Sequence, residues 1–216
     1  FELQIHGIEI LSLPAGEMPI VINKKGLDGV NLNTILDYRP ASLRNPKERA
    51  IFKIQEGIAR GFKEYLLQNG FTEIRSPKIN YAGAEGGTNV FKLDYFGKEV
   101  YLAQSPQLYK QALVGVFGKV YDVGPVFRAE HHDTSRHLNE YTSMDFEIGF
   151  INDFTDIMNM EVGVLKYIMN LLKTEYAPEL ELLHADIPEI TEVQCREIRL
   201  SMCVYHGWWR SRRVGI

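Results

Sequence analysis

The chain has 216 residues, of which 45% are hydrophobic and 24% are charged, and its formal net charge is -4. This composition is typical of a folded globular protein and excludes a disordered chain. No run approaches the roughly 20 apolar residues that span a bilayer, and the first residues lack the basic and apolar regions of a signal peptide. The net charge argues against a module that binds nucleic acid through an overall positive field, but it allows a local basic groove. We therefore expect a cytoplasmic protein without a membrane segment.

The two cysteines, Cys195 and Cys203, form no C-x-x-C pair and have no histidines at metal-binding spacing. A zinc site or a disulfide framework is therefore not supported, and reduced thiols are expected. We predict no metal site within this chain.

The beginning of the chain predicts a strand followed by a linker. Residues Phe1 to Ile10 alternate in polarity as a short strand does. A density of turn-forming residues that is typical of a linker follows before Leu32, namely Pro14, Gly16, Pro19, Gly26 and Gly29. Because the sequence begins within the predicted strand, we expect that an upstream domain preceded it.

Residues Asn45 to Gly70 carry a full set of helix signals. Asn45 stands at the N-cap, Pro46 at the first helical position, Glu48 at the capping-box position and Gly70 just past the end. Apolar side chains recur every three or four residues and predict one buried stripe, made of Ile51, Ile54, Ile58, Phe62, Tyr65 and Leu66.

Two further helices are expected downstream. One should be capped by Ser105, begin at Pro106 and end near Phe117, with Gly118 closing it. The other should cover Phe154 to Lys173. Its buried side should consist of Ile157, Val164, Leu165, Ile168 and Leu172.

Strands are expected at Phe71 to Pro77, Val126 to Glu130 and Tyr141 to Phe150. In the last of these, one face is apolar and consists of Thr142, Met144, Phe146, Ile148 and Phe150, whereas the other carries Tyr141, Ser143, Asp145, Glu147 and Gly149. The pattern alone favours a solvent-exposed polar face by roughly two to one over a binding surface. Arg128 and Glu130 also share a face, and a surface ion pair worth at most about 1 kcal/mol is the simplest interpretation of that pattern.

Several segments resemble the class II aminoacyl-tRNA synthetases of the aspartyl and asparaginyl branch. The segment GPVFRAEHHDTSRHLNEYTSMDFEIGF resembles the second signature motif, and EIRSPKI resembles the first, with Pro77 as its proline. The segments GAEGGTNVF and YLAQSPQLYKQ resemble the mobile loop and the substrate strand of the aspartyl family. The motifs follow the family's order over Leu36 to about Ile190. The resemblance implies an incomplete class II catalytic fold of the α/β (α+β) class, with an antiparallel sheet flanked by helices.

The resemblance also implies a reaction, in which aspartate and ATP, with Mg²⁺, form an aspartyl-adenylate that is then transferred to tRNA. Such a site needs a fixed cation, a divalent metal and close positioning rather than a protein nucleophile. By the match, the forked guanidinium of Arg128 contacts the α-phosphate. Tyr141, where most relatives have phenylalanine, would stack on adenine. His137 would approach the γ-phosphate, and Glu130 would hold the adenine base or the acceptor end of the tRNA. Arg128 and Glu130 are the expected catalytic residues.

Lys110 matches the lysine that binds the substrate's side-chain carboxylate in the aspartyl family. Asparaginyl relatives resemble L-T-Q-S-S-Q-L-Y-L-E over this stretch, from which Pro106 and Lys110 both depart. A cation there discriminates aspartate from asparagine. Without this context, Lys110 would be interpreted as a solvated helix lysine. The other residues expected to bind aspartate are Ser105, Gln107, Glu85 and Asp145. Of these, Glu85 and Asp145 would bind the ammonium group of the substrate.

Glu85 lies in the glycine-rich loop Ala82 to Asn89, which contains Gly83, Gly86 and Gly87. The resemblance implies that this loop closes over the substrate, whereas composition alone allows a plain surface turn.

The resemblance sets the expected domain boundaries. Residues 1–12 would be the last strand of an OB-type anticodon-binding domain, 13–35 a linker and 36–190 the N-terminal part of the catalytic domain. Residues 191–216 hold both cysteines, both tryptophans and five arginines and are an atypical tail. We hypothesise that a frameshift, a truncated gene or an unrelated graft produced it.

The third signature motif and the metal-binding carboxylates are not in the sequence, so we expect this chain to have very weak or no aminoacylation activity. We also expect the helix at Asn45 to Gly70 and the following strand to form a homodimer interface. Three other functions are compatible with the sequence: an enzyme that also charges the asparagine tRNA, an asparagine-forming paralogue, and a non-catalytic fragment that binds tRNA or dimerises.

Overall fold

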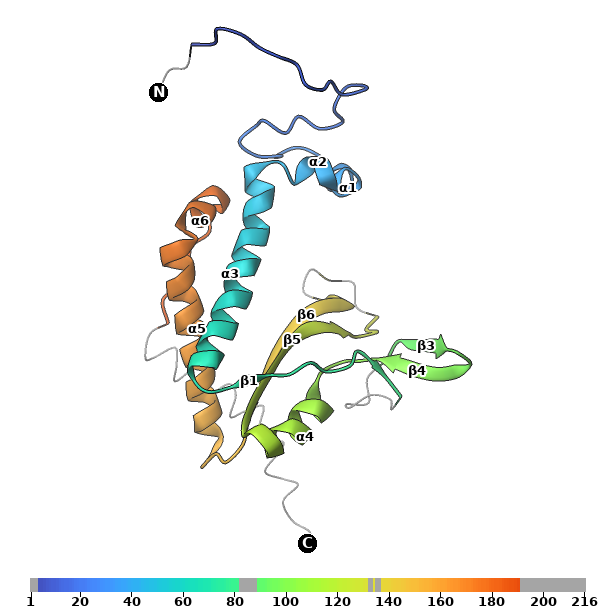
Figure 1. The fold of residues 1–216 in the computed structure, drawn as a ribbon, viewed down its shortest axis with the longest axis vertical. Coiled ribbons are helices and arrows are strands. Elements are labelled where there is room, and N and C mark those ends of the chain that lie inside the picture. The colour runs from blue at the N-terminus through green and yellow to red at the C-terminus, as the bar shows by residue number, and fades with distance from the viewer. Residues whose placement is uncertain (1–3, 82–88, 132–133, 135–136, 191–216) are drawn as a thin grey trace.

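Two long helices pack on one side of a strand ribbon, and smaller elements lie at both ends of the molecule. The structure is a computed structural model that describes residues 4–81, 89–131, 134 and 137–190. Its helices are α1 (Leu32–Asp37), α2 (Arg39–Ser42), α3 (Pro46–Gln68), α4 (Gln107–Phe117), α5 (Phe154–Glu175) and α6 (Ala177–Leu183). Its strands are β1 (Thr72–Glu73), β2 (Ile79–Asn80), β3 (Lys92–Tyr95), β4 (Lys98–Leu102), β5 (Lys119–Phe127) and β6 (Glu140–Ile148). The predicted mixture of strands flanked by helices is confirmed (Figure 1).

The described strands form two small sheets, with the strand orders β1-β5-β6 and β2-β4-β3. β5 and β6 are antiparallel, as are the pairs within the second sheet. One pairing differs from the expected antiparallel sheet, because β1 runs parallel to β5. A parallel pair needs a long crossover connection, and the second sheet and α4 together supply it.

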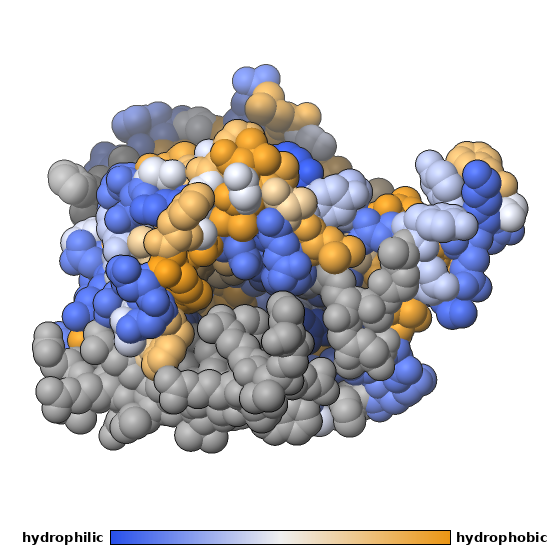
Figure 2. Space-filling view, turned by 90° about the horizontal axis from the view of Figure 1, so that it is seen from below, coloured by the Kyte–Doolittle hydropathy of each residue, from blue (hydrophilic) through white to orange (hydrophobic). Residues whose placement is uncertain are grey.

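The β3–β4 hairpin projects from the rest of the molecule (Figures 1 and 2). Its turn consists of Phe96 and Gly97, which both have positive φ angles, 56° and 78°. This is the backbone that a two-residue hairpin turn requires, and Phe96 tolerates it at 90% exposure. The carboxylate of Asp94 accepts a 2.7 Å hydrogen bond from the Gly97 N–H and holds the turn closed.

Helix α3 begins and ends where its sequence signals predicted. The Asn45 side chain accepts a 3.0 Å hydrogen bond from the Lys47 N–H. Its amide group also donates to the carbonyl oxygens of Ile22 and Lys24, at 3.2 and 2.8 Å, and so ties the preceding segment to the helix. Gly70 follows the helix with a φ of 78°.

The buried stripe of α3 is only partly the one predicted. Phe62 and Leu66 are buried, and Ile54, Ile58 and Tyr65 pack against the core. Ile51 is 41% exposed, so its place in the stripe was wrong. The stripe instead includes the small buried residues Ala50, Gly57 and Gly61. Large residues cannot occupy the two glycine positions, because Leu172, Tyr176, Ile168 and Leu171 approach the helix backbone there.

Helix α5 begins at Phe154 as predicted and ends two residues after the predicted Lys173, at Glu175. Val164, Ile168 and Leu172 are buried, as are Met158, Val162 and Leu171. Ile157 and Leu165 are only partly buried, because they lie at the margins of the stripe.

The main core lies between α3, α5 and one face of the β5–β6 ribbon. Its buried members are Phe62, Leu66, Phe71, Tyr121, Val164, Ile168, Leu171, Leu172 and Tyr176. Tyr121 is fully buried and meets the Phe62 ring edge-on, with 6.0 Å between ring centroids. Burial raises the pKa of the Tyr121 hydroxyl, and the negative charge of Glu73 raises it further. This hydroxyl has no hydrogen-bond partner among the described residues.

The strand predicted at Phe1 to Ile10 is not formed by the described residues 4–10. Ile5, Ile8 and Ile10 are each more than 60% exposed, at 72%, 78% and 66%. A strand needs a hydrogen-bonded neighbour and an apolar surface for its buried face, and no described residue supplies either.

Four other predicted boundaries shift. Helix α4 begins at Gln107, and Pro106 is its N-cap residue, although the Ser105 hydroxyl still accepts a 3.2 Å hydrogen bond from the Gln107 N–H. β5 ends at Phe127, so Arg128 and Glu130 lie beyond the strand that was expected to contain them.

β6 ends at Ile148, and Phe150 is 94% exposed with a φ of 58°. The chain turns out of the sheet there, so Phe150 does not join the apolar face. The strand expected at Phe71 to Pro77 is reduced to β1. In the part of the chain that the structure describes, no helix is long and apolar enough to cross a membrane.

Candidate functional site: the charged face of the β5–β6 ribbon

The face of the β5–β6 ribbon that points away from α3 and α5 carries polar side chains. Asp122 lies directly opposite Asp145 in the ladder, Gly124 opposite Ser143 and Val126 opposite Tyr141. Directly opposed residues of an antiparallel pair project from the same face of the sheet. We call the surface formed by Asp122, Gly124, Tyr141, Ser143, Asp145 and Glu147 the charged face.

Lys110 of α4 lies on the charged face and is almost completely buried. Its side chain is 6% exposed, and its Nζ lies 3.1 Å from Asp145 Oδ1 and 3.6 Å from Glu147 Oε2. The interpretation of Lys110 as a solvated helix lysine is therefore wrong. The interpretation of the polar face of β6 as solvent-exposed is wrong as well, because the Asp145 and Glu147 side chains are only 24% and 29% exposed. α4 packs against this face and covers it.

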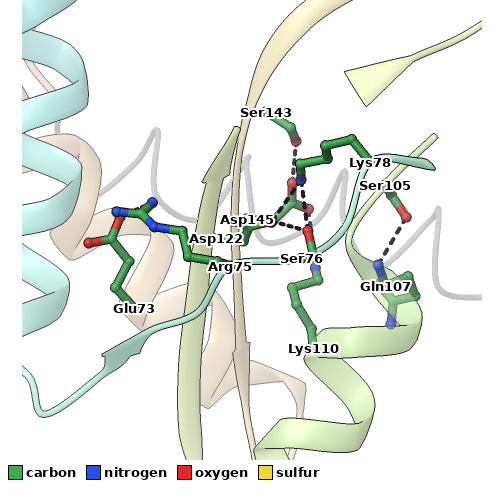
Figure 3. Close-up of polar contacts among 10 residues, drawn as sticks. All are labelled: Glu73, Arg75, Ser76, Lys78, Ser105, Gln107, Lys110, Asp122, Ser143 and Asp145. Carbon is green, nitrogen blue, oxygen red and sulfur yellow. Dashed lines mark hydrogen bonds and ion pairs between the residues drawn. The ribbon is translucent and has the colours of Figure 1, made fainter. Parts of the chain in front are cut away.

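Asp145 is held from a second direction by its own strand. The Ser143 hydroxyl donates to Asp145 Oδ2, while Oδ1 faces Lys110. Both carboxylate oxygens therefore have partners, and the side chain is fixed in orientation. Figure 3 shows this cluster together with Ser105 and Gln107 at the start of α4.

A second ion pair lies beside the first. Asp122 is 3% exposed, and its Oδ2 accepts hydrogen bonds from Lys78 Nζ, at 2.9 Å, and from the Ser76 hydroxyl. Lys78 Nζ also donates to Ser76 Oγ at 2.7 Å. Lys78 lies between β1 and β2, so two different segments bring two ammonium groups to two opposed carboxylates (Figure 3).

Sequence reasoning missed Ser76, Lys78 and Asp122. One signal was available: Asp122 interrupts an apolar strand and shares its face with Gly124, and a buried carboxylate needs a partner. The partner itself could not be found in this way, because Lys78 is 44 residues from Asp122 in sequence.

The residues expected to bind ATP gather at one end of the ribbon. Arg128 directly follows β5 and is exposed, and its guanidinium carbon lies 5.9 Å from the centroid of the Tyr141 ring. The backbone N–H of Arg128 donates to Asn139 O at 2.9 Å, which continues the ladder past the strand end. Arg128 therefore lies against an aromatic ring. The surface ion pair with Glu130 that the sequence suggested is not formed in the part of the chain that the structure describes.

Glu130 is partly buried, and His137 is exposed, with Nδ1 2.6 Å from Thr134 Oγ1. Ser105 and Gln107 lie at the N-terminus of α4, one turn before Lys110. Glu85 and nearly all of its loop lie outside the described residues. Among the described side chains, no group of three or more His, Cys, Asp or Glu is arranged to hold a metal ion.

Comparison with known proteins identifies the class. Residues 31–201 match the family described as tRNA synthetases class II (D, K and N). The match covers most of the chain. This chain therefore belongs to the class II tRNA synthetases of the D, K and N type.

Two similar proteins are named for aspartate. The chain is 50% identical over 190 residues to the aspartate–tRNA(Asp/Asn) ligase of Deinococcus radiodurans, which covers 88% of this chain and 43% of that protein. It is 46% identical over 204 residues to the enzyme of the same name from Thermus thermophilus, covering 91% of this chain and 48% of that one. The chain thus spans less than half the length of these relatives.

A solved structure is also similar. The asparaginyl-tRNA synthetase from Pyrococcus horikoshii, complexed with asparaginyl-adenylate, superimposes with a TM-score of 0.68 at 36% identity, covering 73% of this chain and 36% of that one. This chain is therefore similar to enzymes named for either amino acid.

Proposed function

We propose that this chain is the N-terminal part of the catalytic domain of an aspartate–tRNA ligase. One observation carries the proposal: Lys110 holds a buried positive charge on the charged face, with Asp145 3.1 Å away. A buried ammonium suits a substrate whose side chain ends in a carboxylate, and it disfavours the neutral amide of asparagine. The two relatives named as aspartate–tRNA(Asp/Asn) ligases support the same choice.

Charge complementarity gives the proposed binding mode. In the free chain, Lys110 is paired with Asp145 and Glu147. Aspartate brings a side-chain carboxylate for Lys110 and an ammonium for Asp145, so one internal ion pair is exchanged for two with the substrate. Ser105 and Gln107, at the start of α4, and Glu85 complete the proposed pocket. Binding would keep every buried charge paired, which is the condition for burying it.

For ATP, we propose Arg128 at the α-phosphate, Tyr141 under adenine, His137 near the γ-phosphate and Glu130 at the base or the acceptor end. The contact between Arg128 and the Tyr141 ring supports a shared site for a phosphate and a flat base. We propose that the nucleotide enters as its Mg²⁺ complex. In-line attack by the substrate carboxylate then needs positioning and positive charge, not a protein nucleophile.

We further propose that the protein acts as a cytoplasmic homodimer and transfers the aspartyl group to tRNA. Exposed apolar residues on the first half of α3 support a dimer interface there, since Ile51 and Phe52 are 41% and 47% exposed. The relatives' names also favour a second candidate, an enzyme that charges both the aspartate and the asparagine tRNA.

The test is aspartate-dependent exchange of labelled pyrophosphate into ATP, with asparagine as the control amino acid. It should be run on this chain and on residues 1–190 extended with the remaining catalytic segment of the Deinococcus radiodurans relative. We expect aspartate-specific exchange in the extended protein and very little in the chain alone. Exchange in neither, from folded protein, would leave a binding role. Charging assays with both tRNAs then separate the two candidates.

A further inference from the structure

We propose that Lys78, with Ser76, is a positioning residue that neutralises Asp122 and thereby keeps Lys110 available for the substrate's side-chain carboxylate. This inference rests on the proposed aspartate site. It concerns residues outside the set expected to touch substrate, and it assigns them a part in selecting aspartate over asparagine.

The geometry places two like charges in opposition. Asp122 and Asp145 are a directly opposed pair of the β5–β6 ladder, where Cβ atoms are about 4.5–5.5 Å apart and like charges destabilise the sheet. Asp122 is 3% exposed, so water cannot screen its charge. A carboxylate so placed needs its own cation.

Lys78 supplies that cation from outside the ribbon. Its Nζ lies 2.9 Å from Asp122 Oδ2 and 2.7 Å from Ser76 Oγ, and the Ser76 hydroxyl donates to the same carboxylate oxygen. The Lys78 side chain runs across Gly124, where a Cβ atom would lie 3.1 Å from its Cε and 3.3 Å from its Nζ. The absence of a side chain at Gly124 thus leaves the path by which Lys78 reaches Asp122.

The charges divide into two separate groups as a result. Lys78 pairs with Asp122, and Lys110 pairs with Asp145 and Glu147. If Lys78 lost its charge, the Asp122 carboxylate would add to the negative field around Lys110. That field would hold Lys110 more tightly and repel an incoming carboxylate. Aspartate would bind more weakly, whereas asparagine, with a neutral side chain, would be affected much less.

The test uses the Lys78→Met, Asp122→Asn and double variants of the extended protein, with Lys173→Met as the matched control. Lys173 is on α5, away from the charged face, and forms an exposed ion pair with Glu189. In Lys78→Met we expect the KM for aspartate to rise about tenfold, the size expected of one uncompensated charge within about 10 Å at an effective dielectric constant of about 20. The KM for ATP should stay within about twofold, because the loss concerns aspartate binding alone.

The double variant separates charge from packing. Removing Lys78 and Asp122 charges together leaves no uncompensated carboxylate, so the KM for aspartate and the preference over asparagine should return to within about threefold of the parent. Lys78→Arg, which keeps the charge, should lie near the parent as well. An unchanged aspartate KM in Lys78→Met, or a double variant that is worse than either single one, would overturn the proposal.

A ligand-free measurement keeps the inference separate from the proposed function. If the parent extended protein shows no aspartate-specific exchange, the proposed function fails. The network is then judged from the lysine ammonium NMR signals of the 216-residue chain. We expect the Lys110 signal to shift in Lys78→Met and to return in the double variant. An identical Lys110 signal in the parent and in Lys78→Met would mean that Lys78 acts only on Asp122.

Discussion

The two faces of the β5–β6 ribbon are built by alternate residues of the same two strands, yet their environments are opposite. Tyr121, Val123 and Phe146 point into the core under α3 and α5, whereas Asp122 and Asp145 lie between them on the charged face. Burial of apolar area stabilises the first face, at about 25 cal/mol per Å². On the second face, buried ion pairs contribute little net stability, because desolvation offsets their attraction.

Stability and specificity therefore reside on opposite faces of the β5–β6 ribbon. The core face sets the fold through packing, and the charged face fixes ammonium and carboxylate groups at defined positions. A sheet offers both functions at once, because neighbouring residues project to opposite sides.

Tyr121→Ala should have the largest effect on stability. The Tyr121 side chain is fully buried and contacts the Phe62 ring, so its removal leaves a cavity. We expect the free energy of unfolding to fall by about 3–5 kcal/mol in urea titrations. A loss below about 1 kcal/mol would show that the core face does not carry the fold. Tyr121→Phe is the control, and its loss should stay below about 1.5 kcal/mol, because it keeps the buried ring and removes only the hydroxyl.

Gly57→Ala should be the next largest. A Cβ atom at Gly57 would lie 2.7 Å from Leu172 Cδ2 and 2.8 Å from Tyr176 Cε2, and both of these side chains are buried in the core, so α3 and α5 must move apart. We expect a loss of about 1–3 kcal/mol from overpacking, measured by thermal and urea unfolding.

The matched control is Gly115→Ala in α4, where no atom lies within 4 Å of the added Cβ. It should gain about 0.5–1 kcal/mol from helix propensity. Equal effects at the two glycines would contradict the close packing of α3 on α5.

The double change Lys110→Met with Asp145→Asn tests the charged face. Replacing both members of the closer ion pair by neutral groups of similar size should change the free energy of unfolding by less than about 1 kcal/mol, because Glu147, which also loses Lys110, is 29% exposed and can be solvated. The same change should abolish aspartate-dependent exchange in the extended protein, because both partners proposed for the substrate are removed. A stability loss as large as that of Tyr121→Ala would contradict the division between the two faces.

The smallest effect is the pH dependence contributed by Asp153, the N-cap of α5. The hydroxyl and then the N–H of Thr155 donate to its carboxylate and lower its pKa below the ordinary value of 3.8. A lowered folded-state pKa stabilises the protein above the unfolded pKa, and this stabilisation is lost as the pH falls through the folded pKa. Unfolding measured across the acidic range should therefore show a shallower decline in Asp153→Asn, which keeps the cap without titrating. If the free energy of unfolding declined equally in both proteins as the pH fell, Asp153 would contribute nothing to the pH dependence.

Local signals in the sequence predicted local structure well. Asn45, Pro46 and Gly70 gave the limits of α3, because caps depend only on neighbouring backbone. Lys110 and Asp145 were expected in one substrate pocket, and their side chains lie 3.1 Å apart, but their role in binding stays a prediction. The sequence failed where the outcome depends on distant partners. Residues 4–10 form no strand without a neighbour, and the Lys78–Asp122 pair joins segments whose proximity only the fold creates.

The most direct test of the charged face as an aspartate site is the ratio of kcat/KM for aspartate to that for asparagine in pyrophosphate exchange by the extended protein, before and after Lys110→Met. We predict that the parent prefers aspartate by about 10³-fold or more and that the variant loses at least about a hundredfold of this preference, since a buried charge that matches one substrate rejects its neutral analogue. An unchanged ratio in Lys110→Met would place the selection elsewhere and contradict the account.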